Sequence, residues 1–172
     1  MCGIAGIYNR ASARPVNNTT IDRMVGALGH RGPDGTGSHI SGNAGLGHSR
    51  LSIIDLDGGA QPIFNETGEI CITFNGEIYN YIELREFLVT RGHRFSTRTD
   101  TEVIVHLYEE YGRNFLAHMN GQFALAIWDG REKKFILARD RVGICPLYYS
   151  FTDNGDFLFA SEIKSILASG EV

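Results

Sequence analysis

The first residue after the initiator methionine is a cysteine, in the sequence Met1-Cys2-Gly3. A thiol reacts as its thiolate, and a free cysteine titrates near ~8.5, so a catalytic cysteine is activated by a base within reach. That base is usually a histidine. An α-amino group, with a reference pKa near ~8, can serve if removal of Met1 leaves Cys2 as the chain terminus. Gly3 favours that removal. The alternative is that Cys2 is a small buried apolar residue, the usual role of an unpaired cysteine.

The six histidines do not decide between these interpretations. None lies in a pattern typical of papain-like enzymes, in which a cysteine is paired with a histidine. The histidine positions are His30, His39, His48, His93, His106 and His118. We expect His48 to be a packed core residue.

Composition restricts the class of protein. The 172 residues carry a net charge of −4, and no cluster of Lys and Arg offsets it, which argues against a nucleic-acid or membrane-surface partner. No apolar run approaches the ~18 residues that span a bilayer, and the start lacks the features of a signal peptide, so we expect a cytoplasmic protein. The cysteines Cys2, Cys71 and Cys145 are odd in number and widely spaced. They do not indicate a disulfide framework, and no Cys/His spacing suggests zinc.

The elements that must position Cys2 follow from hydrophobic periodicity and from the glycines that interrupt it. The expected strands are residues 3–8, 43–55 (one strand or two short ones), 69–74, 122–129, 134–140, 146–152 and 156–162. The expected helices are residues 18–28, 81–91 and 99–111, a short turn at 114–121, and residues 162–169.

Turn residues and caps complete this outline. Residues 31–37 and 56–63 are expected loops, and Asn75-Gly76 predicts a turn at which the strand 69–74 ends. Thr99 or Asp100 caps the helix that follows. We expect Trp128 and the Phe and Tyr side chains of the late strands in the core. This order favours an α+β fold, with antiparallel sheets and helices packed outside them.

Seven stretches then resemble a known family, in one order and over essentially the whole chain. They are MCGIAGI, RGPDG, GHSRLSIIDLDGGAQP, FNGEIYNYIELR, TRTDTEVIVHLYEEYG, NGQFALAIWD and DRVGICPLYY. Together they resemble the glutamine amidotransferase domain of class II, the N-terminal nucleophile (Ntn) hydrolase type. The HSRLSIID and GAQP sequences are similar to those in the glutaminase half of glutamine-hydrolysing asparagine synthetases. The resemblance implies one domain over residues 1–172, a four-layer αββα sandwich of two antiparallel sheets between helical layers.

The resemblance also implies catalytic roles. Cys2, after loss of Met1, is the nucleophile that attacks the side-chain amide of glutamine, and its α-amine shuttles protons. The side-chain amide of Asn75 and the backbone N–H of Gly76 form the oxyanion hole, where one donor contributes ~3 kcal/mol. Taken alone, an Asn-Gly pair is more often a hairpin turn.

Glutamine is a zwitterion, so its recognition needs a cation and an anion. By resemblance Arg50 binds the α-carboxylate through its bidentate fork, while Asp100, with Glu77 near it, faces the α-ammonium. Taken singly, each of these charged residues could instead form a surface ion pair or cap a helix. The backbone after Arg50 lines the same pocket, at Leu51, Ser52, Ile53 and Ile54.

Two further features are interpreted as structural. The glycine-rich HRGPDG stretch lacks the Gly-Lys-Ser/Thr ending of a phosphate-binding loop, and we expect it to shape the edge of the pocket, with Arg31 and Asp34 paired there. Cys145 precedes the PLYY stretch and is interpreted as harmless.

The activity implied by the resemblance is hydrolysis of L-glutamine to glutamate and ammonia through a γ-glutamyl thioester on Cys2, with no metal or organic cofactor in this domain. Proteins that it resembles carry a synthetase domain, which uses ATP and Mg²⁺ to make asparagine from aspartate and receives the ammonia. The sequence has no SGGxDS-type loop, so we expect a C-terminal or separate synthetase domain to be absent from this chain. Whether the parent enzyme is a homo-oligomer stays open.

Two alternatives remain. One is an amidotransferase domain that serves a different acceptor, such as a peptide or a sugar acid, because acceptor choice lies in the absent half. The other is a non-catalytic, glutamine-binding regulatory module. Retention of the whole set of implied site residues speaks against the second, namely Cys2, Arg50, Asn75, Gly76 and Asp100.

Overall fold

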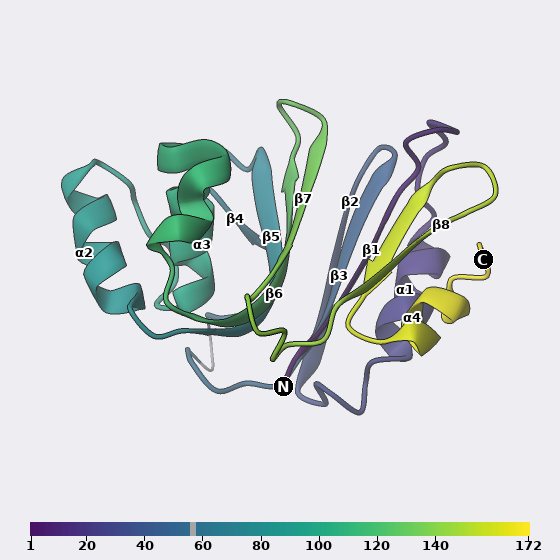
Figure 1. The fold of residues 1–172 in the computed structure, drawn as a ribbon, viewed down its shortest axis with the longest axis horizontal. Helices are drawn as coiled ribbons and strands as arrows, with labels where there is room; N and C mark the ends of the chain where they lie inside the picture. The colour runs from purple at the N-terminus through teal and green to yellow at the C-terminus, as the bar shows by residue number, and fades with distance from the viewer. Residues whose placement is uncertain (56–57) are drawn as a thin grey trace.

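The computed structural model describes residues 1–55 and 58–172 and consists of two antiparallel sheets with helices on their outer faces (Figure 1). The elements in chain order are β1 (Gly3–Tyr8), α1 (Asn18–Gly26), β2 (Gly35–Ser41), β3 (Ala44–Arg50), β4 (Ile63–Phe64), β5 (Ile70–Ile78), α2 (Tyr81–Thr90), α3 (Asp100–Tyr111), the 3-10 helix η1 (Gly112–His118), β6 (Gly121–Asp129), β7 (Lys134–Arg139), β8 (Tyr148–Phe151), β9 (Phe157–Ala160) and α4 (Ile163–Ala168).

The strands divide into a five-stranded sheet, in the order β2-β3-β1-β9-β8, and a four-stranded sheet, in the order β4-β5-β6-β7. Helices α1 and α4 cover the outer face of the first sheet, and α2 and α3 lie outside the second (Figure 1). Each interface between layers holds its own apolar cluster, and the cluster between the sheets includes Ile4, Leu46, Trp128 and Phe159. The predicted α+β, four-layer αββα architecture is therefore confirmed.

The start of the chain is held firmly although it is a terminus. Strand β1 is central in its sheet and pairs with β3 on one side and with β9 on the other. The N–H of Ile4 donates to Ser161 Oγ (2.9 Å), and the N–H of Ser161 donates to Ile4 O (2.8 Å). Cys2 therefore precedes a strand that is bonded on both edges, which prevents the fraying expected of a chain end.

Two local predictions are corrected. Strand β5 continues through Asn75 and Gly76, which pair with Ala124 and Phe123 of β6, so there is no turn at this position. A Cβ on Gly76 would lie 2.2 Å from Gln122 O, which shows that the glycine serves a close approach between strands and not a hairpin. Strand β2 begins inside the predicted loop 31–37, because pairing with β3 overrides the turn preference of glycine.

Other boundaries also shift. Strand β3 ends at Arg50 and does not continue to residue 55, and the short β4 lies where a loop was predicted. Residues 56 and 57 of that loop lie outside the described residues. Thr99, and not Asp100, caps α3, since its side chain accepts from the N–H of Glu102.

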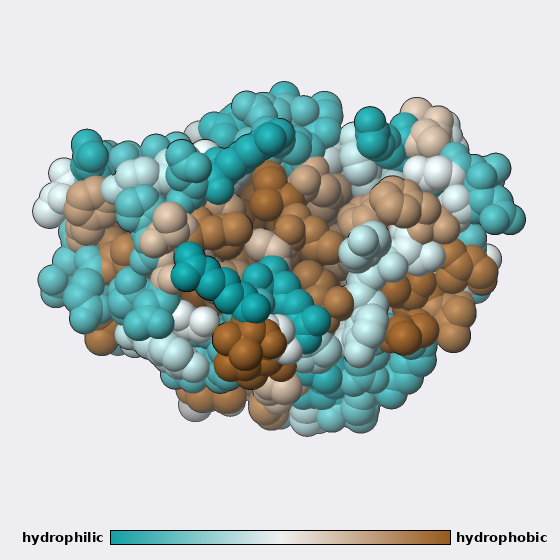
Figure 2. Space-filling view, viewed as in Figure 1, coloured by the Kyte–Doolittle hydropathy of each residue, from teal (hydrophilic) through white to brown (hydrophobic). Residues whose placement is uncertain are grey.

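The expectation of a fully buried aromatic core is wrong at one edge. Trp128 and Phe159 are buried, but Tyr149 and Phe151 of β8 are 67% and 60% exposed. Strand β8 is the edge of its sheet, so a neighbouring strand covers it on one side only. Apolar side chains gather on this part of the surface, at the right of the space-filling view, over β8 and α4 (Figure 2).

The cysteines are all free, as expected, and Cys71 and Cys145 are buried. None of the helices in residues 1–55 and 58–172 combines the length and the apolar character needed to cross a membrane.

Candidate active site

The sulfur of Cys2 lies at the mouth of a pocket between the two sheets. It accepts a hydrogen bond from the N–H of Leu51 (3.4 Å), and the thiol can donate to Leu51 O (3.5 Å). The thiol is only partly buried, so a small molecule can reach it. The pocket is lined by Met1, Cys2, Arg50, Leu51, Ile53, Ile54, Gly59, Gln61, Phe74, Asn75, Gly76, Glu77, Thr99, Asp100, Thr101 and Gln122.

The structure thus brings together every site residue expected from the sequence except Ser52. The backbone N–H of Ser52 turns away and donates to Asp34 Oδ2 (2.8 Å). This contact also corrects the expected pair between Arg31 and Asp34. Arg31 instead donates from Nε to Cys2 O (2.9 Å) and from Nη1 to Glu162 Oε1 (3.0 Å). It is therefore a positioning residue for the chain start.

Asn75 presents a polar side chain that is buried and has no protein partner. Its residue is 1% exposed, and neither Oδ1 nor Nδ2 has a hydrogen-bond partner among the described residues. An unpaired buried amide costs about 1–3 kcal/mol, so its retention needs a reason. A ligand in the pocket that accepts from Nδ2 supplies that reason.

The backbone N–H of Gly76 lies on the edge of β5 that borders the pocket. Along β5, the N–H of Phe74 donates to Gln61 Oε1 (2.6 Å) and that of Ile78 to Asp100 Oδ2 (2.9 Å). Since alternate N–H groups of a strand point to the same edge, the N–H of Gly76 faces the edge between these two. The short β4 pairs only with Cys71 and Ile72, which leaves this stretch of the edge open to the pocket.

Arg50 ends β3 at the other wall of the pocket. Its Nη2 donates to the backbone O of Asp55 (2.6 Å), which fixes one arm of the guanidinium. Gly59 packs against the same group, because a Cβ on Gly59 would lie 2.6 Å from Nη2 and 2.9 Å from Asp55 O. The glycine in the GGAQP stretch therefore makes room for the arginine.

Replacing Gly59 by alanine should displace the Arg50 guanidinium and raise the KM for glutamine about tenfold or more, with a smaller effect on kcat, because carboxylate binding is lost. Steady-state glutaminase kinetics measure this. Gly26→Ala in α1 is the control: a Cβ there meets nothing within 4 Å, so kinetics should not change and helix stability should rise by up to ~1 kcal/mol. Unchanged KM in Gly59→Ala would contradict the role of Arg50.

Asp100 places a buried carboxylate opposite the arginine. It is the first residue of α3, is 5% exposed, and accepts from the N–H of Ile78. Burial raises the pKa of this carboxyl, the N–H groups that it accepts from oppose the rise, and the negative charge of Glu77 adds to it. Glu77 itself is exposed at the rim of the pocket. A ligand ammonium would relieve the repulsion between the two acids.

The raised pKa predicts how glutamine binding depends on pH. Only the ionised Asp100 attracts an ammonium, so affinity should fall about tenfold per pH unit below a pKa that lies above the usual ~3.9. Calorimetry on Cys2→Ala protein isolates binding from turnover. Asp100→Asn protein should bind glutamine about 10- to 150-fold more weakly at pH 7, because a charge-assisted hydrogen bond is lost. Its affinity for glutamine should depend little on pH. Asp22→Asn, on the exposed side of α1, is the matched control. A pH-independent affinity in the parent protein would refute this assignment.

The described residues that line the pocket include no histidine. His48 is buried, as expected, and its Nε2 lies 3.2 Å from Phe74 O. Burial lowers the pKa of His48 to about 4, opposed by the bond to Phe74 O, so this imidazole is neutral. A thiol at Cys2 therefore has no histidine base beside it.

Sequence reasoning missed several residues of the pocket. Gln61 bridges two walls, since its Oε1 accepts from Phe74 N and its Nε2 lies 3.4 Å from Thr101 Oγ1. Gly59 and Gln61 belong to the quoted GGAQP stretch, which could have drawn attention to them. Thr101 and Gln122 also lie in quoted stretches, TRTDTEVIVHLYEEYG and NGQFALAIWD, but neither residue type indicates a role by itself, and the fold brings both to the pocket.

Comparison with known proteins identifies the family of this chain. The family model described as glutamine amidotransferase domain matches residues 1–172. The chain belongs to this family. Among curated proteins, the glutamine amidotransferase domain is 47% identical over 170 residues to glutamine-hydrolysing asparagine synthetase 2 of Bacillus subtilis (strain 168), with 98% of this chain and 22% of that protein covered. It is 43% identical over 166 residues to glutamine-hydrolysing asparagine synthetase 2 of Oryza sativa subsp. japonica, with coverages of 96% and 28%.

The chain thus spans only about a quarter of the length of these relatives. Among solved structures, glutamine phosphoribosylpyrophosphate amidotransferase from B. subtilis superposes with a TM-score of 0.81 at 23% identity, covering 98% of this chain and 44% of that one. At this identity the likeness concerns the fold. It agrees with the four-layer αββα sandwich of the glutamine amidotransferase domain.

Proposed function

We propose that this domain hydrolyses L-glutamine to L-glutamate and ammonia through a γ-glutamyl thioester on Cys2. One observation carries the proposal: the Cys2 thiol, the unpartnered amide of Asn75 and the opposed charges of Arg50 and Asp100 line a single pocket that holds no histidine among its described residues. The base for the thiol is then the α-amine of Cys2 itself, once Met1 has been removed.

In the first half of the reaction, the Cys2 amine accepts the thiol proton, directly or through a water. The thiolate adds to the carboxamide carbon, and the side chain of Asn75 and the N–H of Gly76 donate to the resulting oxyanion. Collapse of the tetrahedral intermediate breaks the C–N bond. The protonated amine returns its proton to the leaving nitrogen, which departs as ammonia.

In the second half, a water attacks the thioester carbon while the Cys2 amine accepts one of its protons. The same two donors stabilise the second oxyanion. When this intermediate collapses, the C–S bond breaks, glutamate leaves and the thiolate recovers its proton from the amine. These steps need no metal or organic cofactor, because every group that moves a proton or holds charge belongs to the chain.

The substrate is held by its two charges. Arg50 faces the α-carboxylate and Asp100 the α-ammonium, which leaves the side chain to extend toward the sulfur. Glu77 adds negative charge at the rim, and the backbone of Leu51, Ile53 and Ile54 supplies the remaining wall. Ser52 is not part of this wall, since its N–H donates to Asp34.

We further propose that the ammonia serves a synthetase domain that makes asparagine from aspartate, with ATP and Mg²⁺ bound in that domain and not in this one. The names of the relatives support this role, and so does the share of their length that the chain leaves unmatched. Three free thiols fit a reducing location such as the cytoplasm.

Labelling with 6-diazo-5-oxo-norleucine, an electrophilic glutamine analogue, tests the glutaminase proposal. Mass spectrometry should find one adduct, on Cys2 of chains that have lost Met1, and Cys2→Ala should prevent it. Burial raises the pKa of Cys71 to about 12 and also raises that of Cys145, so neither should react. An adduct on either of those two cysteines, with Cys2 unmodified, would overturn the proposal.

A further inference from the structure

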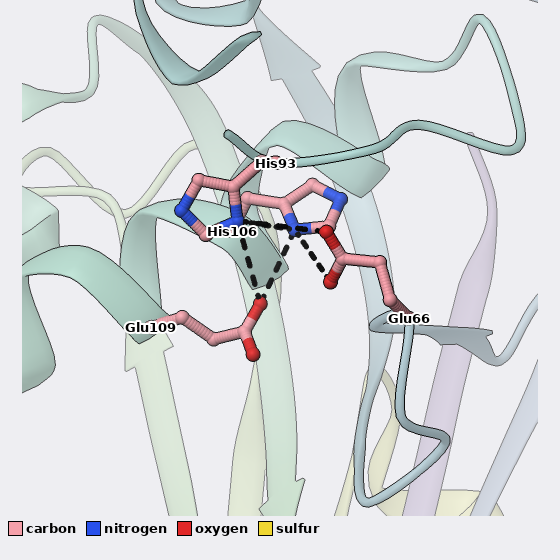
Figure 3. Close-up of side chains that lie close together, drawn as sticks. All are labelled: Glu66, His93, His106 and Glu109. Atoms are coloured by element: carbon pink, nitrogen blue, oxygen red, sulfur yellow. Dashed lines mark hydrogen bonds and ion pairs between the residues drawn. The ribbon is translucent and has the colours of Figure 1, made fainter. Parts of the chain in front are cut away.

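A second group of chemically active side chains lies outside the pocket, on the side of the molecule formed by α3. Glu66 comes from the turn between β4 and β5, His93 from the segment after α2, and His106 and Glu109 from one face of α3 (Figure 3). We call these four residues the histidine–glutamate cluster. None of the four lines the active-site pocket.

Both imidazoles turn the same nitrogen toward the centre of the cluster. Nδ1 of His93 lies 3.1 Å from Nδ1 of His106 (Figure 3). The opposite nitrogens face carboxylates: Nε2 of His93 lies 3.2 Å from Glu110 Oε1, and Nε2 of His106 lies 3.8 Å from Glu102 Oε1. With the ring protons on Nε2, both Nδ1 lone pairs face one point, where a single cation can bind to both; with one ring proton on Nδ1, the two nitrogens instead share a hydrogen bond.

The carboxylates complete a four-sided arrangement around that point. Nδ1 of His106 lies 3.2 Å from Glu109 Oε2 and 3.5 Å from Glu66 Oε2. Nδ1 of His93 lies 3.8 Å from an oxygen of each glutamate, and all four donor atoms lie within 4.8 Å of one another. For comparison, Zn²⁺ bound at about 2.0–2.1 Å by tetrahedral N and O ligands would hold neighbouring donors about 3.3–3.4 Å apart.

The surroundings also favour positive charge. His106 is fully buried, and the carboxylates of Glu66, Glu102 and Glu109 all lie within 4 Å of its ring nitrogens. The outer partners of the carboxylates are in place as well. Glu109 Oε1 accepts from Asn65 Nδ2 (2.8 Å), and Glu66 Oε1 accepts from the N–H of Arg94 (2.8 Å).

We propose that the histidine–glutamate cluster is a structural Zn²⁺ site, with His93 and His106 as nitrogen ligands and Glu66 and Glu109 as oxygen ligands. The carboxylate of Glu110 lies behind His93, 3.2 Å from its Nε2, an arrangement common at zinc-binding histidines, while Glu102 lies farther behind His106, 3.8 Å from its Nε2. The one-third exposed side chain of Glu66 provides the route of entry for the ion.

The metal would fasten the β4–β5 turn to residues 92–99 and to α3, which follows them directly. The segment 92–99 leads directly into Thr99 and Asp100 of the active-site pocket. It is also held by Glu102, whose carboxylate accepts from the N–H groups of Ser96 and Thr97. The site is thus placed to stabilise one wall of the pocket without taking part in the reaction.

The test uses the metal-free 172-residue chain carrying Cys2→Ala, because a terminal thiol and amine would themselves bind zinc. Calorimetry with Zn²⁺ should show one equivalent bound, and Co²⁺ should give the intense visible bands of tetrahedral nitrogen and oxygen coordination. Zn²⁺ should also raise the unfolding temperature, since the ligands converge only in the folded state.

Variants locate the site. His93→Gln and Glu66→Gln, at the accessible side of the cluster, should abolish stoichiometric binding, while Glu110→Gln should weaken it about 10- to 100-fold through the orientation of His93. His118→Asn, which removes an exposed histidine elsewhere, should bind as the parent does. The proposal fails if the parent shows no saturable binding, in which case protons alone occupy the cluster. It also fails if His93→Gln binds as tightly as His118→Asn.

Discussion

A version of this protein that keeps its N-terminal methionine should lose glutaminase activity by at least about 10²-fold. Insertion of a lysine between Met1 and Cys2 prevents removal of the methionine. The nitrogen of Cys2 then remains part of a peptide bond and cannot act as a base. General acid–base catalysis is worth 10²–10⁴-fold. The described residues that line the pocket offer no histidine to replace this amine. Glutamate release, measured against the processed protein, gives the size of the effect.

A matched control restores the amine without changing the sequence after it. A second extended form carries a protease site ending directly before Cys2, and cleavage should return activity to the level of the processed protein. Glutamine binding to both forms, measured by calorimetry in the Cys2→Ala background, separates a lost base from a blocked pocket, since Met1 itself lines the pocket. Turnover at the processed rate by the extended chain would rule out the amine as the base.

The candidate site residues named from the sequence lie together in the structure, whereas several of the elements that carry them were predicted wrongly. Cys2, Arg50 and Asp100 lie in stretches that resemble the family. Arg50 ends β3, Asp100 begins α3 and Cys2 directly precedes β1, so we expected them to converge once the fold was expected. The Asn75-Gly76 pair shows the limit of local reasoning. The dipeptide has a strong turn preference, but the pairing of β5 with β6 overrides it.

Features that depend on tertiary approach could not be predicted. The start of strand β2 was predicted as a loop because glycines favour turns. In the structure Gly37 instead allows a close approach of two backbone segments, since a Cβ on it would lie 2.0 Å from Gln61 O. The exposure of Tyr149 and Phe151 follows from the edge position of β8, which periodicity does not reveal. The histidine–glutamate cluster assembles from three separate segments, and only its His106 and Glu109 share a helix.

Asn75 matters both for the proposed reaction and for the stability of the fold. Its buried amide is expected to serve the reaction, but burying it unpaired costs stability. Asn75→Ala should lower kcat about 10²–10³-fold, the usual loss on removing one oxyanion donor, and leave the KM for glutamine nearly unchanged. The same substitution should not destabilise the fold beyond a small cavity effect, since it removes a buried amide with no partner among the described residues. Steady-state kinetics and urea unfolding measure the two effects on one preparation.

Asn65→Ala should behave in the opposite way and is the matched control. Asn65 is also buried, but its Nδ2 donates to Thr67 and Glu109, and its Oδ1 accepts from the N–H groups of Glu69 and Ile70. Its removal leaves those partners unsatisfied, so we expect a loss of about 1–3 kcal/mol in the free energy of unfolding with kcat retained. If Asn75→Ala instead lost stability and kept its kcat, Asn75 would be a structural residue like Asn65, and the oxyanion would have to be stabilised by other donors.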